Sequence, residues 1–506
     1  MISILLLASF TPIFIILIGI LLLLNLDERE NRNSLCTLLL GISLFLNTVL
    51  LVVYSLLDLN ERSFNLNFDA GTLFIIEMIL LLGLLTVVFS KREMVNIVNE
   101  KQLNSFILLI ILSLIGTVLT ANILISITCF LLTLFFIGVF FYFGQFTKEF
   151  ELLRWYFLSV GLSAVLLFFA SFLLLLEVNT LIVTEIVFIE ISPVSNFFIT
   201  ALFVFGFGIP CGLFPFLIFH LRNYFQDSSY SSLIIYFNFL STTIFLILRV
   251  LNIFSLSYLP NGILILIISS IGLIVSLVYV VTELFTSLDG NTFSIKKIFG
   301  YSLCSDFNIA LLFISYITIL KSMNGYSLYL NILLFLFFSL IALKSLLVFS
   351  FFPIMVETFD DNFKLLGSLK EKYPRFSYLF PIIGLIFALP ITFLFLNNVM
   401  TVFSQKLIIS NSLYSFIAFM MVGFYIFYLL IHLILISILF VQIFYGNRPR
   451  YIERESPIQI RLEHYRPSLL IFLIIGLIIT LGILEVVGVQ KNIFYQTFKI
   501  FFLNIN

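Results

Sequence analysis

Five side chains that can gain or lose a proton interrupt long apolar stretches of the sequence: Glu77, Asp306, Lys344, His432 and Glu485. A charge at membrane depth is costly, so such residues usually belong to proton or ion paths or pair with one another. The candidates for a proton path are Lys344, Asp306, His432 and Glu77, whereas Glu485 is expected at the membrane interface. Asp306 and Lys344 form either a stretch of that path or a buried ion pair that fixes helix packing. For His432 we favour the simpler interpretation, a histidine hydrogen-bonded to a neighbour.

The elements that must position these residues are transmembrane helices. The chain has 506 residues, of which 61% are hydrophobic and 10% charged, whereas soluble domains carry about 25% charged residues. Lipid-facing strands would alternate apolar and polar residues, and the sequence has continuous apolar runs instead. The predicted fold class is therefore all-α, a polytopic membrane protein with about 14 transmembrane helices. The expected spans cover residues 2–25, 35–58, 70–90, 104–120, 122–145, 153–177, 194–220, 229–254, 261–284, 298–320, 327–352, 376–403, 412–445 and 467–489.

The distribution of basic residues tests this number of spans. Of the 26 lysines and arginines, 19 fall in loops after odd-numbered helices and six on the other side, and Lys344 lies within a span. One missed or extra helix in the middle would scramble this asymmetry. By the positive-inside rule, the side with 19 faces the matrix or cytoplasm, and both termini lie on the opposite side.

Two of the spans contain clusters of helix-breaking residues. Span 7 carries Gly206, Gly208, Pro210, Gly212 and Pro215, and span 12 carries a second cluster of the same kind, Pro381, Gly384 and Pro390. Broken helices at corresponding places in two halves are typical of transporters built from inverted repeats. We therefore expect two inverted five-helix repeats with broken helices 7 and 12. The predicted domains are 1–100 (helices 1–3), 101–256 (helices 4–8), 257–445 (helices 9–13) and 446–506 (a loop and helix 14).

Motifs for catalysis, metal binding or cofactor binding are not recognisable in the sequence. The four cysteines, Cys36, Cys129, Cys211 and Cys304, stand singly in apolar stretches, so neither a disulfide nor a metal site is expected. The loops carry no P-loop and no nucleotide-binding fingerprint. We expect no catalytic residue, no metal and no cofactor in this chain, and no nucleic-acid partner.

Four short segments resemble the antiporter-like membrane subunits of respiratory complex I, which are related to multi-subunit sodium/proton antiporters. Residues 154–161 resemble the K-Y-F-L-x-G opening of helix 6 in that family. Residues 206–216 resemble G-F-x-x-K-x-G-x-x-P-F in broken helix 7. Residues 296–302 resemble K-R-x-x-A-Y-S-S at the start of helix 10, and residues 343–349 resemble F-K-A-L-L-F in helix 11. The segments follow the family's order at matching helices.

The chain departs from the family pattern at the ionisable positions that the resemblance implies. The helix 5 glutamate falls near Phe130 or the next residue, and the helix 7 lysine falls on Pro210. The helix 8 lysine falls near Ser241, and the helix 12 lysine or glutamate falls on Asn398. Lys344 is the family lysine that remains.

The resemblance implies a membrane-arm subunit of proton-pumping NADH:ubiquinone oxidoreductase with no redox chemistry of its own. Because Ser, Asn, Pro and Phe cannot carry the charge of a proton, we expect proton translocation to be reduced or lost and the role to be largely structural. Lys344 favours a subunit like chain 2 over one like chain 4. The expected partners are other membrane subunits of complex I and lipids.

The expected location is the mitochondrial inner membrane, because the Phe/Ile/Leu/Asn/Tyr excess is typical of AT-rich organelle genomes. The alternative is a bacterial or archaeal plasma membrane. Two other functions stay open: an Mrp-type cation/proton antiporter subunit, which should retain the helix 5 glutamate and helix 7 lysine, and a non-transporting scaffold of another respiratory assembly. An unrelated transporter or a lipid-handling enzyme is a further alternative, but the three histidines are scattered.

Overall fold

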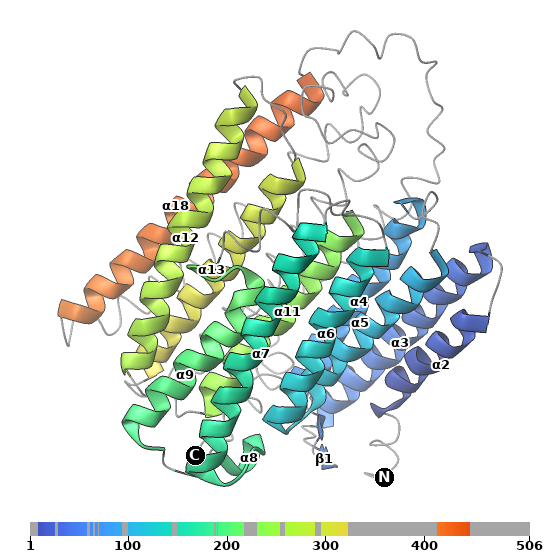
Figure 1. Ribbon diagram of the computed structural model, residues 1–506, viewed down its shortest axis with the longest axis horizontal. Helices are drawn as coiled ribbons and strands as arrows, with labels where there is room; N and C mark the ends of the chain where they lie inside the picture. Colours follow the sequence, from blue (N-terminus) through green and yellow to red (C-terminus); the bar gives the residue numbers. More distant parts are fainter. Residues whose placement is uncertain are drawn as a thin grey trace. The chain divides into compact units, whose positions relative to one another are not determined.

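The structure is a computed structural model, and it is helical almost throughout the part that it describes (Figure 1). It describes residues 9–25, 29–57, 61–63, 66–68, 70–93, 100–143, 150–186, 189, 191–216, 230–253, 259–288, 295–321 and 412–445. The helices are α2 (Thr11–Asn25), α3 (Arg29–Leu57), α4 (Ala70–Glu93), α5 (Glu100–Leu119), α6 (Ile123–Phe143), α7 (Phe150–Val178), α8 (Val183–Ile186), α9 (Pro193–Gly208), α11 (Tyr230–Ile253), α12 (Leu259–Leu288), α13 (Ile295–Lys321) and α18 (Ser412–Tyr445).

Each predicted span that falls within the described residues corresponds to a helix, although the bounds differ in places. Within those residues, six helical segments are long and apolar enough to cross a bilayer, and five further apolar segments are shorter. These eleven segments correspond to eleven of the expected spans. The expected spans 327–352, 376–403 and 467–489 lie outside the described residues, as do Lys344, Asn398 and Glu485.

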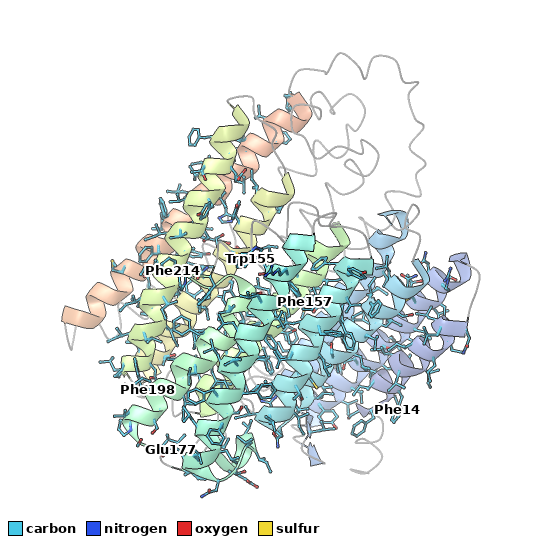
Figure 2. All side chains as sticks on the ribbon, viewed as in Figure 1. Phe14, Trp155, Phe157, Glu177, Phe198 and Phe214 are labelled. Carbon is cyan, nitrogen blue, oxygen red and sulfur yellow. The ribbon has the colours of Figure 1, made fainter. Side chains whose placement is uncertain are left out.

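The helices carry apolar side chains on their outer faces, as lipid contact requires. Phe14 on α2 is 57% exposed and Phe198 on α9 is 58% exposed, and both point outward (Figure 2). In hydrocarbon every backbone polar group needs an internal partner, which a helix supplies within one segment. The all-α prediction is confirmed, and the chain is a multi-pass membrane protein.

The described residues fall into two compact units. The first unit comprises those up to residue 265 together with 317–321, and the second comprises 266–316 and α18. In the first unit α4 packs against α3, α5 and α11, while α5 packs against α2, α4 and α6, and α7 packs against α6 and α9. The predicted domain division stays a prediction.

A small β-hairpin that was not predicted follows α3. Strand β1 (Glu61–Ser63) pairs antiparallel with β2 (Leu66–Phe68). Leu66 also forms a bridge with Thr120 in the turn between α5 and α6, and Asn122 in that turn forms a bridge with Ile182 after α7. The loops after the second, fourth and sixth expected helices therefore meet at one face, as alternating spans require. The expected spans 104–120 and 122–145 meet at this turn between α5 and α6.

The break predicted in span 7 is present. Helix α9 begins after Ser192, whose hydroxyl accepts a hydrogen bond from the Ser195 N–H at 3.3 Å. It ends at Gly208 and is followed by a 3₁₀ turn, η2 (Ile209–Cys211). Gly212 closes the turn with φ of 78°, and Leu213 donates its N–H to the Gly208 carbonyl at 3.0 Å. A glycine in the left-handed region is the usual end of such a helix.

Candidate functional site

The side chain of Phe130, at the expected helix 5 position, lies within a cluster of aromatic rings in the first unit. Phe130 on α6 is fully buried. Its ring meets Phe207 of α9 edge-on at 5.0 Å between centroids and stacks on Phe239 of α11 at 5.2 Å. Phe203, one turn before Phe207, stacks on it at 6.1 Å, and Tyr236 lies 6.1 Å from Phe239. We call these five residues the aromatic cluster.

The break after α9 contributes a backbone carbonyl to the aromatic cluster, not a charged side chain. The Tyr236 hydroxyl donates to the Pro210 carbonyl at 3.4 Å, and both residues are buried. Proline has no side-chain group that can ionise. Phenol gives up its proton only at about pH 10 in water. The aromatic cluster therefore packs three helices together and offers no group that exchanges protons near neutral pH.

The hydroxyl of Ser241, the third replaced position, bonds to the backbone of its own helix, α11. Its hydroxyl donates to the Asn238 carbonyl at 2.8 Å, and the neighbouring Thr242 hydroxyl donates to the same carbonyl at 2.9 Å. Such bonds to the preceding turn are the usual way a buried serine or threonine is satisfied in a helix. Ser241 is 2% exposed, so its one proton is engaged inside α11.

Glu77, the candidate in α4, is held by two side chains of α3. Asn47 donates one amide hydrogen to Glu77 Oε2 at 2.7 Å and the other to the Leu73 carbonyl at 2.9 Å. Thr48 lies 2.5 Å from Glu77 Oε1 and donates to the Leu44 carbonyl at 2.8 Å. The Glu77 carboxyl group thus joins the neighbouring helices α3 and α4, neither of which carries a residue of the aromatic cluster.

The second unit brings two of the predicted candidates into one buried polar group. Asp306 on α13 is 2% exposed, and its Oδ1 accepts a hydrogen bond from the hydroxyl of Tyr428 on α18. The Tyr428 ring lies 4.2 Å from the imidazole of His432, one turn further along α18. Asp306 and His432 are therefore joined through Tyr428. The expected partner of Asp306, Lys344, lies outside the described residues.

His432 is fully engaged by hydrogen bonds. Its Nδ1 lies 2.8 Å from the Tyr428 carbonyl oxygen. Its Nε2 lies 3.2 Å from Ser302 Oγ and 3.4 Å from Ser305 Oγ, both on α13. Ser305 also donates to the Ser302 carbonyl at 2.6 Å. The five residues Ser302, Ser305, Asp306, Tyr428 and His432 form the polar cluster.

Three members of the polar cluster were not identified from the sequence: Ser302, Ser305 and Tyr428. Their spacing carried a signal, because Ser302, Ser305 and Asp306 share one face of a helix, and Tyr428 and His432 share another. What the spacing cannot show is that the two faces meet. No group of three or more potential metal ligands occurs among the described residues, and the four cysteines have free thiols.

Comparison with solved structures identifies the fold. The chain is similar to a chain of the membrane-bound sulfane sulfur reductase, an archaeal respiratory membrane complex, with a TM-score of 0.68 and 14% identity, over 99% of this chain and 97% of the other. It is also similar to a chain of respiratory complex I from Thermus thermophilus, with a TM-score of 0.63 and 13% identity, over 94% and 97%. No family profile and no curated protein matches the sequence. The resemblance to a membrane subunit of complex I is thus confirmed at the level of the fold.

Proposed function

We propose that the chain is a membrane-arm subunit of a complex I-type NADH:ubiquinone oxidoreductase of the mitochondrial inner membrane, with a largely structural role. The similarity of fold over 94% of the chain to a chain of respiratory complex I supports this. So does the order of the four sequence segments along matching helices. Electron transfer belongs to partner subunits, and this chain supplies helices that pack against other membrane subunits and lipids.

The aromatic cluster is the observation that carries the structural role. In the resembling family the helix 5 and helix 7 positions hold an acid and a lysine, whereas here Phe130 packs between Phe207 of α9 and Phe239 of α11, and Pro210 lies within the 3₁₀ turn that follows the helix break. A proton path needs groups that load and release a proton. Phenylalanine and proline provide none, so translocation through this half is reduced or lost.

A scaffold of another respiratory membrane complex is the second candidate. The similarity to a chain of an archaeal sulfane sulfur reductase complex favours it. An Mrp-type antiporter subunit is disfavoured because it would need the helix 5 and helix 7 charges. A chain 2-like identity, with Lys344 retained, is preferred to a chain 4-like one.

Purification from native membranes distinguishes these candidates. We expect the chain to co-purify in one large complex with iron–sulfur and NADH-binding subunits. A complex that lacks an NADH-oxidising partner would favour the scaffold of another respiratory assembly.

The Lys344→Met variant tests whether the role is structural. We expect the intact complex to pump the same number of protons per NADH as the wild type. A matched control is Lys321→Met, at the end of α13. A drop by one subunit's share in Lys344→Met alone would overturn the structural role.

A further inference from the structure

The hydrogen bonds of His432 assign its protons. A carbonyl oxygen only accepts hydrogen bonds, so His432 Nδ1, 2.8 Å from the Tyr428 carbonyl, must be the donor. The neutral ring then carries its proton on Nδ1 and has an unprotonated Nε2. The fold thus fixes one tautomer and directs the lone pair of Nε2 toward the two serines of α13.

The two serines leave that lone pair ready to take a proton. Ser305 uses its single hydroxyl proton on the Ser302 carbonyl at 2.6 Å, so Ser302, at 3.2 Å, is the donor to Nε2 of the neutral ring. When Nε2 binds a proton and a new N–H bond forms, the Ser302 oxygen can accept that bond with its lone pairs. Only the Ser302 hydroxyl has to rotate, and no heavy atom must move.

The carboxyl group of Asp306 lies on the other side of Tyr428. The tyrosine hydroxyl donates to Asp306, and its ring lies 4.2 Å from the imidazole. Tyr425 stacks on Tyr428 at 6.3 Å and meets Phe313 of α13 at 5.6 Å. A protonated His432 would therefore lie against an aromatic ring, which favours cations, and the Asp306 carboxyl group would lie one hydrogen bond beyond that ring.

From these contacts we propose that Asp306, Tyr428 and His432 form a proton-binding centre in the second unit. His432 Nε2 binds one proton from the aqueous phase, Ser302 switches from donor to acceptor, and Asp306 supplies the counter-charge through Tyr428. The ligand is a single proton, and its binding does not depend on the chain's part in an oxidoreductase. A proton can thus be held in one half of the chain even though the aromatic cluster provides no such group in the other.

Nitrogen-15 NMR of the full-length chain in lipid bilayers tests this directly. The sequence has three histidines, so the His432 signals are those that the His432→Gln variant lacks. Where that variant does not accumulate, the His220→Gln/His464→Gln double variant isolates the same signals. We expect the proton on Nδ1 at high pH and on both nitrogens as the pH falls.

Two variants test the counter-charge. Asp306→Asn can still accept the Tyr428 hydrogen bond but has no charge, so the ratio of protonated to neutral His432 at a fixed pH should fall by about tenfold, as expected for one charge at an effective dielectric constant of about 20. Tyr428→Phe should lower the same ratio while leaving the tautomer unchanged, because the backbone carbonyl remains. Ser276→Ala is the control, since Ser276 is buried in the same unit and bonds only to its own helix.

Three results would overturn the proposal. One is a neutral ring with its proton on Nε2. Another is a ring that stays neutral over the whole pH range in which the chain remains folded. The third is an unchanged protonated fraction in both Asp306→Asn and Tyr428→Phe. Because none of these measurements uses the assembled complex, they can fail while the proposed membership in a respiratory complex stands, and the reverse is also true.

Discussion

The aromatic cluster of the first unit and the polar cluster of the second unit differ in their chemistry. Each joins neighbouring helices through buried rings. In the first unit the rings are mainly phenylalanines around Phe130, whereas in the second unit Tyr428 and His432 link to Asp306. Helices can thus pack through buried rings without any charged group, as they do in the first unit. Packing alone therefore does not explain why the second unit has Asp306 and His432 at its helix interface.

The largest expected loss of unfolding free energy comes from removing a ring of the aromatic cluster, compared with removing a ring that is exposed on the outer face. Phe130→Ala removes a fully buried ring with neighbours on two helices, and such truncations cost about 3–5 kcal/mol of unfolding free energy. The measurement is reversible unfolding in mixed micelles. The control is Phe135→Ala on the same helix, whose ring is 50% exposed. Equal losses in the two variants would contradict a packing role for the cluster.

A smaller effect is expected in the polar cluster. Tyr428→Phe keeps the ring but removes the donor to Asp306, and a hydrogen bond to a charged group contributes about 1.5–3 kcal/mol. The same unfolding assay measures it. Tyr279→Phe is the matched control, because the Tyr279 ring stacks on Tyr301 at 5.2 Å and the substitution keeps that stack. If both variants unfold like the wild type, Tyr428 does not hold Asp306 as described.

The smallest of the three expected losses of unfolding free energy concerns the close packing of α9, which carries Phe207, against α7. A Cβ added to Gly206 on α9 would lie 2.7 Å from the Leu167 side chain of α7, and overpacking of this kind costs about 1–3 kcal/mol. Gly206→Ala should therefore lower the unfolding free energy.

A matched control for this approach lies on α7. Gly161→Ala meets nothing within 4 Å and should be neutral or slightly stabilising, since alanine favours helix. Leu167→Ala should restore part of the loss in the double variant. A loss in Gly161→Ala equal to that in Gly206→Ala would exclude the steric explanation.

Much of the fold could be predicted because bilayer thickness constrains each helix separately. Apolar length located the spans, and proline with glycine located the break in α9. The second span was expected to begin at residue 35, yet α3 begins at Arg29. The helix continues beyond its apolar part because Arg32 and Asn33 are buried, and Asn33 accepts a hydrogen bond from Asn104.

The clusters could not be predicted because they depend on which helices are neighbours. Asp306 and Tyr428 are 122 residues apart in the sequence, and helical periodicity gives each face but not its partner. The same holds for Arg249, which lies within the expected span 229–254. It is buried on α11, and its guanidinium donates to the Val118 carbonyl at the end of α5 at 2.9 Å, where the helix dipole favours a cation.

The bridges at the turn between α5 and α6 have a consequence for how the chain is made. Ala121 accepts from the Val183 N–H and Ile123 donates to the Leu181 carbonyl, both at 3.0 Å, and Thr120 bridges back to Leu66. During synthesis this turn emerges before α7 exists, so its second set of partners arrives only when α7 has crossed the membrane. The hydrogen bonds between these loops therefore form only after insertion. In a nascent chain that ends before residue 181, the Ala121 carbonyl and the Ile123 N–H must bind water or a chaperone instead.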